Sequence, residues 1–158
     1  MSLAAQLKRL PRRARTCQVP QALNEGLFQV DATWGAVQPI ELAPGVRTIG
    51  ELELIEHLRE GQPVIDTRLA HFHHQATIPG ARSIPHEQIL DHVDELSHSA
   101  PTAFFCNGPQ CAATPDAVHK LLNAGYPPDA IYYYRGGIHD WIMLGYPTVP
   151  GQYAVAVG

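Results

Sequence analysis

Short apolar runs alternate with stretches of helical periodicity from about residue 46 to residue 150. The runs are too short for buried helices, so they predict strands at residues 63–66, 103–105 and 131–134, with a further brief strand within residues 78–85. Helices are expected over residues 49–60, 70–75, 86–96, 115–124 and 138–144. This alternation predicts an α/β fold with a mainly parallel sheet and helices on both faces.

The start of the first of these helices carries a capping signal. Thr48 and Glu51 have the spacing of a capping box, in which the threonine hydroxyl accepts a backbone N–H and the glutamate reaches back. The helix that ends before Gly125 has Thr114 as its expected N-cap and Pro115 as its first helical residue. Asp116 suits that helix start electrostatically, and no chemistry is assigned to it.

Residues 1–46 lack strong periodicity and are interrupted by proline and glycine. We interpret them as an N-terminal extension, residues 47–150 as the folded domain and residues 151–158 as a C-terminal tail. Phe28 and Trp34 are expected to pack on the domain. The basic residues near the start are interpreted as a solvated flanking segment.

Composition narrows the class of protein. The chain has 158 residues, 45% apolar and 16% charged, which is typical of a globular domain with a proper core. Its formal net charge of −4 argues against a nucleic-acid partner. No apolar run approaches the roughly 20 residues that span a bilayer, so no membrane partner is expected. We expect a cytoplasmic location, with a periplasmic one left open if a signal peptide has been removed.

The chemistry-bearing stretch is residues 102–116. Cys106 follows an apolar run, and a loop containing Gly108 and Pro109 leads from it into a helix. Open α/β sheets bind ligands at the carboxyl ends of their strands, where loop N–H groups and a helix dipole can stabilise an anion. Such surroundings lower the pKa of a cysteine from its free value of about 8.5. We therefore predict a reactive thiol, in preference to a buried structural cysteine.

Four segments in a fixed order resemble the rhodanese family of single-domain sulfurtransferases: residues 64–68 (VIDTR), 77–85 (TIPGARSIP), 105–108 (FCNG) and 135–147 (RGGIHDWIMLGYP). The resemblance covers about residues 46–150 and implies a five-stranded parallel sheet with helices on both sides. It also implies that Cys106 carries a sulfane sulfur as a persulfide. The donor would be thiosulfate or another persulfide, and the acceptor cyanide, a thiol or a protein. No cofactor and no metal are expected.

The loop after Cys106 would stabilise thiolate and persulfide anions through its N–H groups. The residues of this expected anion cradle are Asn107, Gly108, Gln110, Cys111 and Ala112. Thiosulfate-using members of the family often carry an arginine five residues after the cysteine, where this chain has Cys111. Pro109 also removes one N–H from the cradle. Both departures weaken the expectation that thiosulfate is the natural donor.

Several side chains have two interpretations. Cys111 is either a resolving thiol that attacks the Cys106 persulfide or a small buried residue at the helix start. Arg68 and Arg135 are candidates for anion contacts, and structural ion pairs are the alternative. Asp66 is expected to be structural, as is Thr77, which stands where the family has a histidine. Cys17 lies in the extension and is interpreted as incidental.

Histidines at positions 71, 73 and 74 invite a metal hypothesis, because imidazole suits zinc, copper or nickel. No Cys or His spacing matches a structural zinc site, so a solvated histidine-rich loop is predicted instead. Trp141 is expected in the core.

Four functions follow from these patterns. The leading hypothesis is a sulfurtransferase that uses Cys106. The second is a catalytically weak module that binds a partner, partly through the extension. The third is a redox protein using Cys106 and Cys111, although their spacing is not Cys-x-x-Cys. The fourth, a phosphatase of the same fold, is disfavoured because Ala112 stands where those enzymes have an arginine.

Overall fold

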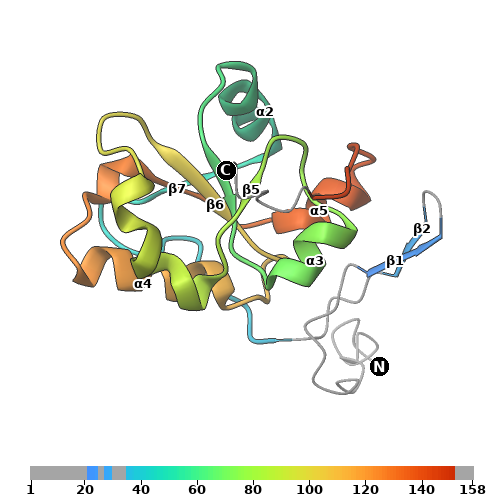
Figure 1. Cartoon of the computed structure of the whole chain (residues 1–158), viewed down its shortest axis with the longest axis horizontal. Helices are drawn as coiled ribbons and strands as arrows, with labels where there is room; N and C mark the ends of the chain where they lie inside the picture. Colours follow the sequence, from blue (N-terminus) through green and yellow to red (C-terminus); the bar gives the residue numbers. More distant parts are fainter. Residues whose placement is uncertain (1–20, 25–26, 30–34, 152–158) are drawn as a thin grey trace, which may run out of the picture.

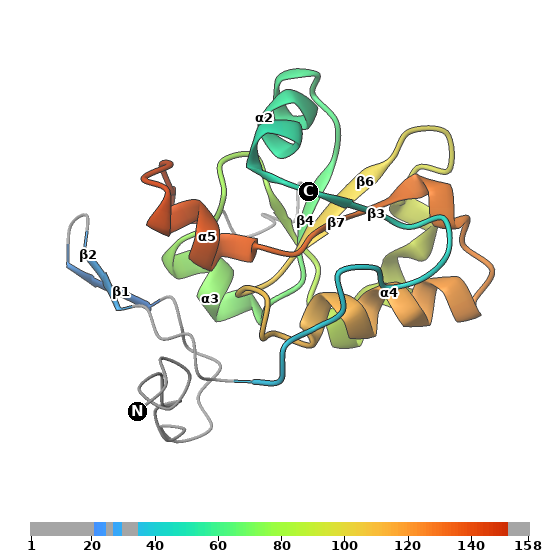
Figure 2. The ribbon, with the colours of Figure 1, turned by 180° about the vertical axis from the view of Figure 1, so that it is seen from behind.

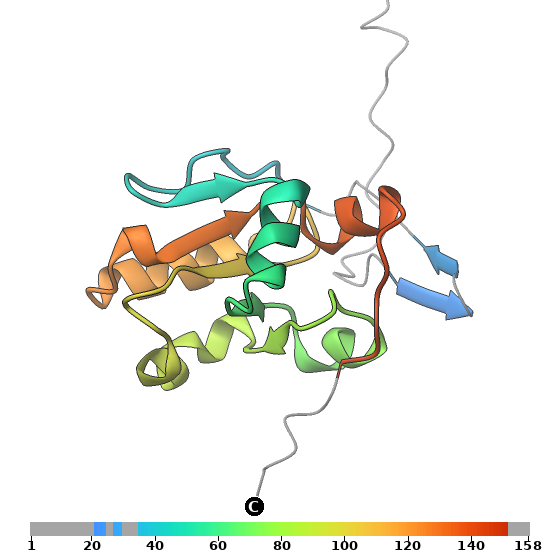
Figure 3. The same ribbon diagram turned by 90° about the horizontal axis from the view of Figure 1, so that it is seen from above.

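A computed structural model of the chain describes residues 21–24, 27–29 and 35–151. Its centre is a five-stranded sheet in the order β3-β7-β6-β4-β5. The strands are β3 (Arg47–Ile49), β4 (Val64–Asp66), β5 (Arg82–Ser83), β6 (Thr102–Phe105) and β7 (Ile131–Tyr134). Every neighbouring pair is parallel, and Figure 3 shows the strands side by side. The predicted parallel α/β sheet is confirmed.

Helices cover both faces of this sheet. They are α2 (Glu51–Arg59), α3 (Ala70–Gln75), α4 (Ala113–Asn123), α5 (Gly137–Met143) and the 3₁₀ helices η1 (His86–Glu95) and η2 (Pro128–Ala130). Figure 1 shows α2 and α4 on opposite sides of the sheet, and Figure 2 shows the same layers from behind. The strands therefore need apolar residues on both faces, which explains why they read as continuous apolar runs.

Alternate residues of each strand enter two separate cores. Phe104 and Tyr133 pack with Val118 and Leu121 of α4 and with Ile89 of η1. Phe105 and Tyr134, one position later in their strands, pack with Leu54 of α2 and with Ile138 and Trp141 of α5. Because successive side chains of a strand point to opposite faces, one short strand anchors helices on both sides. Trp141 lies in the core, as predicted.

The predicted capping box at Thr48 is wrong. Thr48 belongs to β3, where it pairs with Tyr133 of β7. Helix α2 begins at Glu51 with Gly50 as its N-cap, and the Glu53 carboxylate accepts the Gly50 N–H at 3.4 Å. Pairing with a strand already in the sheet overrides the local capping signal, because it satisfies the backbone groups of residues 47–49.

Three further local predictions need correction. Helix α4 begins at Ala113, so Thr114 is not its N-cap. The helical segment after His86 is a 3₁₀ helix over most of its predicted length. His73 is only 1% exposed, so the solvated histidine loop is wrong for that residue. Its ring faces the buried Asp66 carboxylate, which supplies the hydrogen bond that burial requires.

The extension contains a short antiparallel pair that the sequence did not predict, β1 (Gln21–Asn24) with β2 (Leu27–Gln29). Cys17 and the side chains of Phe28 and Trp34 lie outside the described residues, as do residues 152–158 of the tail. Gly151 donates its N–H to the His73 carbonyl oxygen at 2.9 Å. Within the described part of the chain, no helix is long and apolar enough to cross a membrane.

Candidate active site

Cys106 lies at the carboxyl end of the central strand of the sheet. It directly follows β6, which is flanked by β4 and β7. Residues 107–112 form the loop that leads into α4, and within it the Cys111 N–H donates to the Gly108 carbonyl oxygen at 3.0 Å. The predicted order of strand, thiol, loop and helix is confirmed.

The double glycine after β7 lets α5 approach this loop. The Ile138 N–H donates to the Cys106 carbonyl oxygen at 3.0 Å, and the His139 N–H donates to that of Asn107 at 2.8 Å. Gly137 has φ +63°, and a Cβ there would lie 2.5 Å from the Cys106 carbonyl oxygen. Only glycine fits both demands. The start of α5 therefore fixes the direction of the backbone on either side of the thiol.

The Cys106 sulfur is enclosed by hydrogen-bonding groups. Its side chain is 2% exposed, and the sulfur accepts the Thr114 N–H at the start of α4 at 3.4 Å. The thiol also reaches the Cys111 carbonyl oxygen at 3.6 Å. A sulfur in this position faces the positive end of a helix, which favours its anionic form, whereas its shielding from water opposes that form.

Burial by itself raises the pKa of the Cys106 thiol. Hydrogen bonds from the Cys111 thiol, the Thr114 side chain, and the backbone N–H groups of Thr114 and Gly108 outweigh it and lower the pKa to about 7. A large fraction of Cys106 is then thiolate at neutral pH, and the thiolate is the nucleophile of cysteine chemistry.

Two buried threonines form a hydrogen-bonded pair next to the Cys106 sulfur. The Thr67 hydroxyl donates to the Phe105 carbonyl oxygen at 2.9 Å, and the hydroxyls of Thr67 and Thr114 are 2.8 Å apart. The Thr114 hydroxyl can rotate between Thr67 and the Cys106 sulfur, because its proton is free to turn. Sequence analysis missed this pair, although Thr67 lies within the VIDTR segment that carries the resemblance.

Cys111 differs from Cys106 in both position and charge. It is 7% exposed and lines the pocket described below, which Cys106 does not. Its hydrogen bond to Cys106, followed by burial and the charge on Cys106, raises the pKa of Cys111 well above its ordinary value. Cys111 is therefore the protonated partner and Cys106 the anionic one. Its role as a resolving thiol stays a prediction.

The two arginines predicted as anion contacts both have protein partners. The Arg68 guanidinium donates to the Asp66 carboxylate at 3.0 and 2.7 Å and to the Ala76 carbonyl oxygen at 2.7 Å. The Arg135 guanidinium donates to the Gln38 carbonyl oxygen at 3.1 and 2.8 Å. Arg68 still lines the pocket, while Arg135 does not.

Asp66 has the structural position that its sequence context predicts. It is fully buried, and besides Arg68 it contacts His73 at 3.0 Å and accepts the Thr77 hydroxyl at 2.9 Å. Burial raises the pKa of this carboxyl, but the Arg68 charge and the bonds from His73 and Arg68 outweigh it and hold the pKa well below its usual range. Asp66 thus stays charged without facing the pocket.

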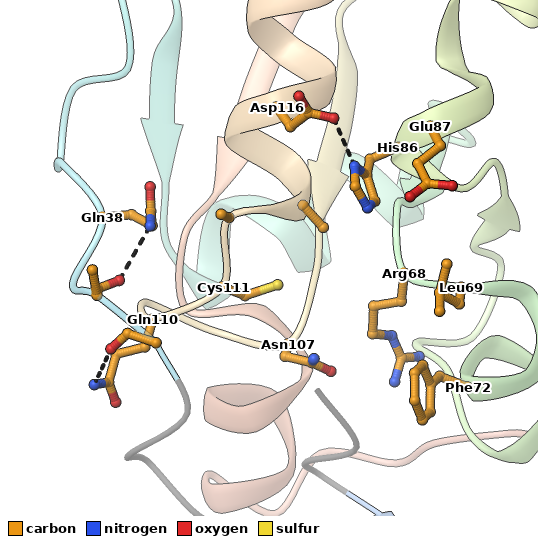
Figure 4. Close-up of a pocket in the computed structure, with 14 residues that line it drawn as sticks. Gln38, Arg68, Leu69, Phe72, His86, Glu87, Asn107, Gln110, Cys111 and Asp116 are labelled. Atoms are coloured by element: carbon orange, nitrogen blue, oxygen red, sulfur yellow. Dashed lines mark hydrogen bonds and ion pairs between the residues drawn. The ribbon is translucent and has the colours of Figure 1, made fainter. Parts of the chain in front are cut away.

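A pocket of about 590 Å³ lies in front of the loop. Figure 4 shows the Cys111 sulfur pointing into it, with Gln38 and Gln110 on one side and Arg68, Leu69 and Phe72 on the other. Its lining residues are Gly35, Ala36, Gln38, Arg68, Leu69, Phe72, His86, Glu87, Asn107, Gln110, Cys111, Ala112, Ala113 and Asp116. Of the predicted cradle, only Gly108 is not at this surface; its N–H bonds to Cys106 instead.

Sequence analysis did not foresee several of these lining residues. His86 and Asp116 come from η1 and α4, and the ring nitrogen Nδ1 of His86 is 2.6 Å from the Asp116 carboxylate. Residues 35–38 come from the extension. No motif marks them, because their place depends on how distant segments pack. Among the residues that the structure describes, no group of three or more His, Cys, Asp or Glu could hold a metal ion.

Comparisons with known proteins agree with this geometry. The sequence model described as "Rhodanese-like domain" matches residues 51–144, more than half of the chain. The HTH-type transcriptional regulator Rv0324 of Mycobacterium tuberculosis is 28% identical over 104 residues. That alignment covers 65% of this chain but only 45% of the regulator, so the chain spans about half of its curated relative.

Solved structures share the fold. The BH2092 protein of Bacillus halodurans superimposes with a TM-score of 0.58 at 25% identity, over 65% of this chain and 76% of that one. A thiosulfate sulfurtransferase of Pseudomonas aeruginosa superimposes with a TM-score of 0.55 at 25% identity, over 68% of this chain and 21% of that one. With the sheet order, the cysteine loop and the double glycine in place, the chain belongs to the rhodanese-like domain family.

Proposed function

We propose that this protein is a sulfurtransferase that carries a sulfane sulfur on Cys106 as a persulfide. One observation carries the proposal: the Cys106 sulfur accepts the Thr114 N–H at the start of α4 while its side chain is almost fully buried. Burial raises the pKa of Cys106, yet hydrogen bonds bring it down to about 7, so the site supports a nucleophilic thiolate.

The reaction has two steps. First, the Cys106 thiolate attacks the outer sulfur of a donor R–S–SH. The donor's S–S bond breaks, R–S⁻ departs as the leaving group, and Cys106 becomes a persulfide. Second, an acceptor thiolate attacks the outer sulfur of that persulfide, and the Cys106 thiolate departs as the acceptor becomes a persulfide. Because the enzyme holds the sulfur between the two steps, ping-pong kinetics are expected.

The charges around the site favour a persulfide donor over thiosulfate. Cys111 occupies the position where an arginine would contact a dianion. The guanidinium groups of Arg68 and Arg135 already bond to Asp66 and to the Gln38 carbonyl oxygen. A doubly charged donor entering this pocket would lose water without gaining a free cation among the described residues that line it, which is costly. An organic or protein persulfide carries less charge and avoids most of this cost.

Intact-protein mass spectrometry tests the proposal. The wild type and the variants Cys106→Ser and Cys111→Ser are incubated, without reductant, with thiosulfate or with a low-molecular-weight persulfide. The expected result is a gain of one sulfur, strongest with the persulfide, lost on adding cyanide, kept in Cys111→Ser and absent in Cys106→Ser. A Cys106→Ser variant that still gains and transfers sulfur would exclude the mechanism. Loss of two hydrogens instead would indicate a Cys106–Cys111 disulfide.

A second candidate function is that of a regulatory module that receives sulfur and keeps it. The observation that favours it is the similarity to a protein named as a transcriptional regulator, of which this chain spans 45%. The two candidates differ in the second step. A transferase discharges its persulfide to an acceptor within each turnover, whereas a regulatory module retains it under the same conditions. A time course of persulfide loss after adding acceptor separates them.

A further inference from the structure

The segment formed by residues 35–38, here called the strap, is hydrogen-bonded across the cysteine loop. The Gln110 side-chain amide donates to the Gly35 carbonyl oxygen at 2.8 Å, and the Gln38 N–H donates to the Pro109 carbonyl oxygen at 2.7 Å. Arg135, which follows β7, donates twice to the Gln38 carbonyl oxygen. The strap lies outside residues 51–144, where the family model matches.

Gly35 shows how closely the strap approaches the loop. A Cβ at this position would lie 2.0 Å from the Gln110 carbonyl oxygen, a distance that no side chain tolerates. Glycine is therefore required where the two backbones meet. This close approach, together with the hydrogen bonds to Gly35 and Gln38, makes the strap part of the active-site wall.

The strap turns the front of the loop into a pocket with a defined size. Gly35, Ala36 and Gln38 line this pocket. Figure 4 shows Gln38 on one side of it, Leu69 and Phe72 on the other, and the Cys111 sulfur between them. The volume of about 590 Å³ falls within the range of sites for small organic molecules. Cyanide or thiosulfate would fill only a small part of it. Its apolar side chains suit the methylene groups of an organic ligand.

Among the described residues that line this pocket, the charged groups are acidic or neutralised. Arg68 is paired with Asp66 at 2.7 Å, and Asp116 is paired with both His86 and Lys120. Glu87 is exposed at the pocket, on the side away from Gln38 (Figure 4), and within the described part of the chain it forms no ion pair. A ligand whose far end is positively charged would meet Glu87 there, whereas a negatively charged end would be repelled.

We propose that the strap and the wall facing it bind the sulfur acceptor, and that this acceptor is a low-molecular-weight aliphatic thiol with an ammonium group. The inference rests on the proposed sulfurtransferase function and names the acceptor class of that same site. The acceptor loses its thiol proton to solvent, and its thiolate attacks the outer sulfur of the Cys106 persulfide. The persulfide bond breaks, the Cys106 thiolate is regenerated, and the acceptor leaves as its own persulfide.

Single-turnover discharge of the Cys106 persulfide tests this acceptor class. The full-length protein is loaded with one sulfur and mixed with cysteamine, with 3-mercaptopropionate or with cyanide, and persulfide loss is followed by mass spectrometry. Rate constants for the two thiols are compared at equal thiolate concentration, because their thiol pKa values differ. The expected result is a rate constant about tenfold higher for cysteamine than for 3-mercaptopropionate.

Two variants connect this preference to the pocket. Glu87→Gln is expected to remove most of the preference for cysteamine. Ala36→Phe fills the strap side of the pocket and is expected to lower the ratio of the cysteamine rate to the cyanide rate about tenfold. Its matched control is Ile40→Phe, an exposed position beyond the strap that does not line the pocket, which should leave both rates unchanged. Thermal unfolding of each variant verifies that it is folded.

The outcomes separate this inference from the proposed function. Equal rates for the two thiols, with no effect of Glu87→Gln, would overturn the acceptor class. An Ala36→Phe variant that slows cyanide as much as cysteamine would overturn the role of the strap. If Ala36→Phe does not fold, the exposed Glu87→Gln substitution still decides the charge preference. A wild-type protein that acquires no sulfur from any donor would instead refute the sulfurtransferase function itself.

Discussion

Cys106 and Cys111 have different roles in forming a thiolate at this site: Cys106 becomes the anion, and Cys111 donates a hydrogen bond to it. Cys106 accepts hydrogen bonds and has a pKa lowered to about 7 by them, in spite of its burial. Cys111 gives one of those bonds, and that bond is the main cause of its own raised pKa. A thiol at position 111 can thus stabilise the neighbouring anion without adding a positive charge to the pocket.

Replacing Cys111 should raise the pKa of Cys106. In Cys111→Ala the donor is lost, and the pKa moves up towards its ordinary value, whereas Cys111→Ser keeps a hydroxyl donor and restores part of the effect. If the rise is one unit, the rate of Cys106 alkylation at pH 7 should fall about fivefold. The pH dependence of alkylation by iodoacetamide gives the midpoint directly. A midpoint that is unchanged in Cys111→Ala would contradict this division of roles.

At the scale of elements, Asp66 joins the end of β4 to its neighbours. Its carboxylate contacts the guanidinium of Arg68, the ring of His73 in α3 and the hydroxyl of Thr77. Arg68 lines the pocket together with Leu69 and Phe72, and these two residues are the chain neighbours of Arg68 and His73. The network therefore holds one wall of the site in place, although Asp66 itself has no contact with a substrate.

Asp66→Asn should destabilise the fold by about 3 kcal/mol, because it leaves the buried Arg68 charge without its counterion. The wild-type carboxyl has a folded pKa below its unfolded value of about 4. The stabilisation that the ionised Asp66 carboxylate adds to the free energy of unfolding is therefore complete above pH 4 and is lost as the pH falls towards the folded pKa. Urea unfolding at neutral and acidic pH measures both effects.

An exposed ion pair supplies the control for Asp66. Glu95 bonds to Arg82 at 2.6 Å on the surface, and Glu95→Gln should leave the free energy of unfolding almost unchanged, because solvent screens an exposed ion pair. A similar loss for Asp66→Asn and Glu95→Gln would show that the buried network does not anchor the pocket wall.

The sequence predicts elements that are long or strongly apolar and misses those that depend on a partner. Strands β4, β6 and β7 were found from their apolar runs, and helix α3 was found with its bounds. Strand β5 lies within residues 78–85, where a brief strand was predicted, and it pairs with β4. Strand β3 was missed, because its three residues form a strand only where β7 is there to pair with them. The same holds for the Thr67–Thr114 pair, whose members are 47 residues apart.

In the candidate site too, the features that depend on local sequence could be predicted, and the contacts between distant segments could not. Cys106 and its loop follow from local pattern, because strand, thiol and helix are consecutive in the chain. The ion pair of Arg68 was among the alternatives considered from sequence, but the backbone partners of Arg68 and Arg135 were not evident, since Ala76 and Gln38 offer carbonyl oxygens that any residue would supply. The pocket wall made by the strap was equally hidden, because no side-chain type distinguishes residues that bind through their backbone.

For the whole molecule, the consequence is a candidate site whose front is completed by residues 35–38, which precede the first strand of the sheet in the chain. The parallel sheet brings Cys106 and the start of α5 to one edge, and the strap closes the front of the loop. Few strap side chains are buried, so the strap should contribute little to global stability and much to the shape of the pocket. Stability and acceptor selectivity should therefore respond separately to changes in the strap.

Gly35→Ala tests this separation, because the added Cβ would collide with the Gln110 carbonyl oxygen and force the strap away from the loop. We expect discharge of the Cys106 persulfide to cysteamine to slow about tenfold, with faster hydrogen exchange of the Gln38 N–H and a melting temperature within about 2 °C of the wild type. Gly50→Ala is the matched control, since a Cβ there meets nothing within 4 Å and its φ of −97° suits alanine. If Gly35→Ala discharges as fast as Gly50→Ala, the strap does not shape the site; if it unfolds the protein, the strap belongs to the folding core instead.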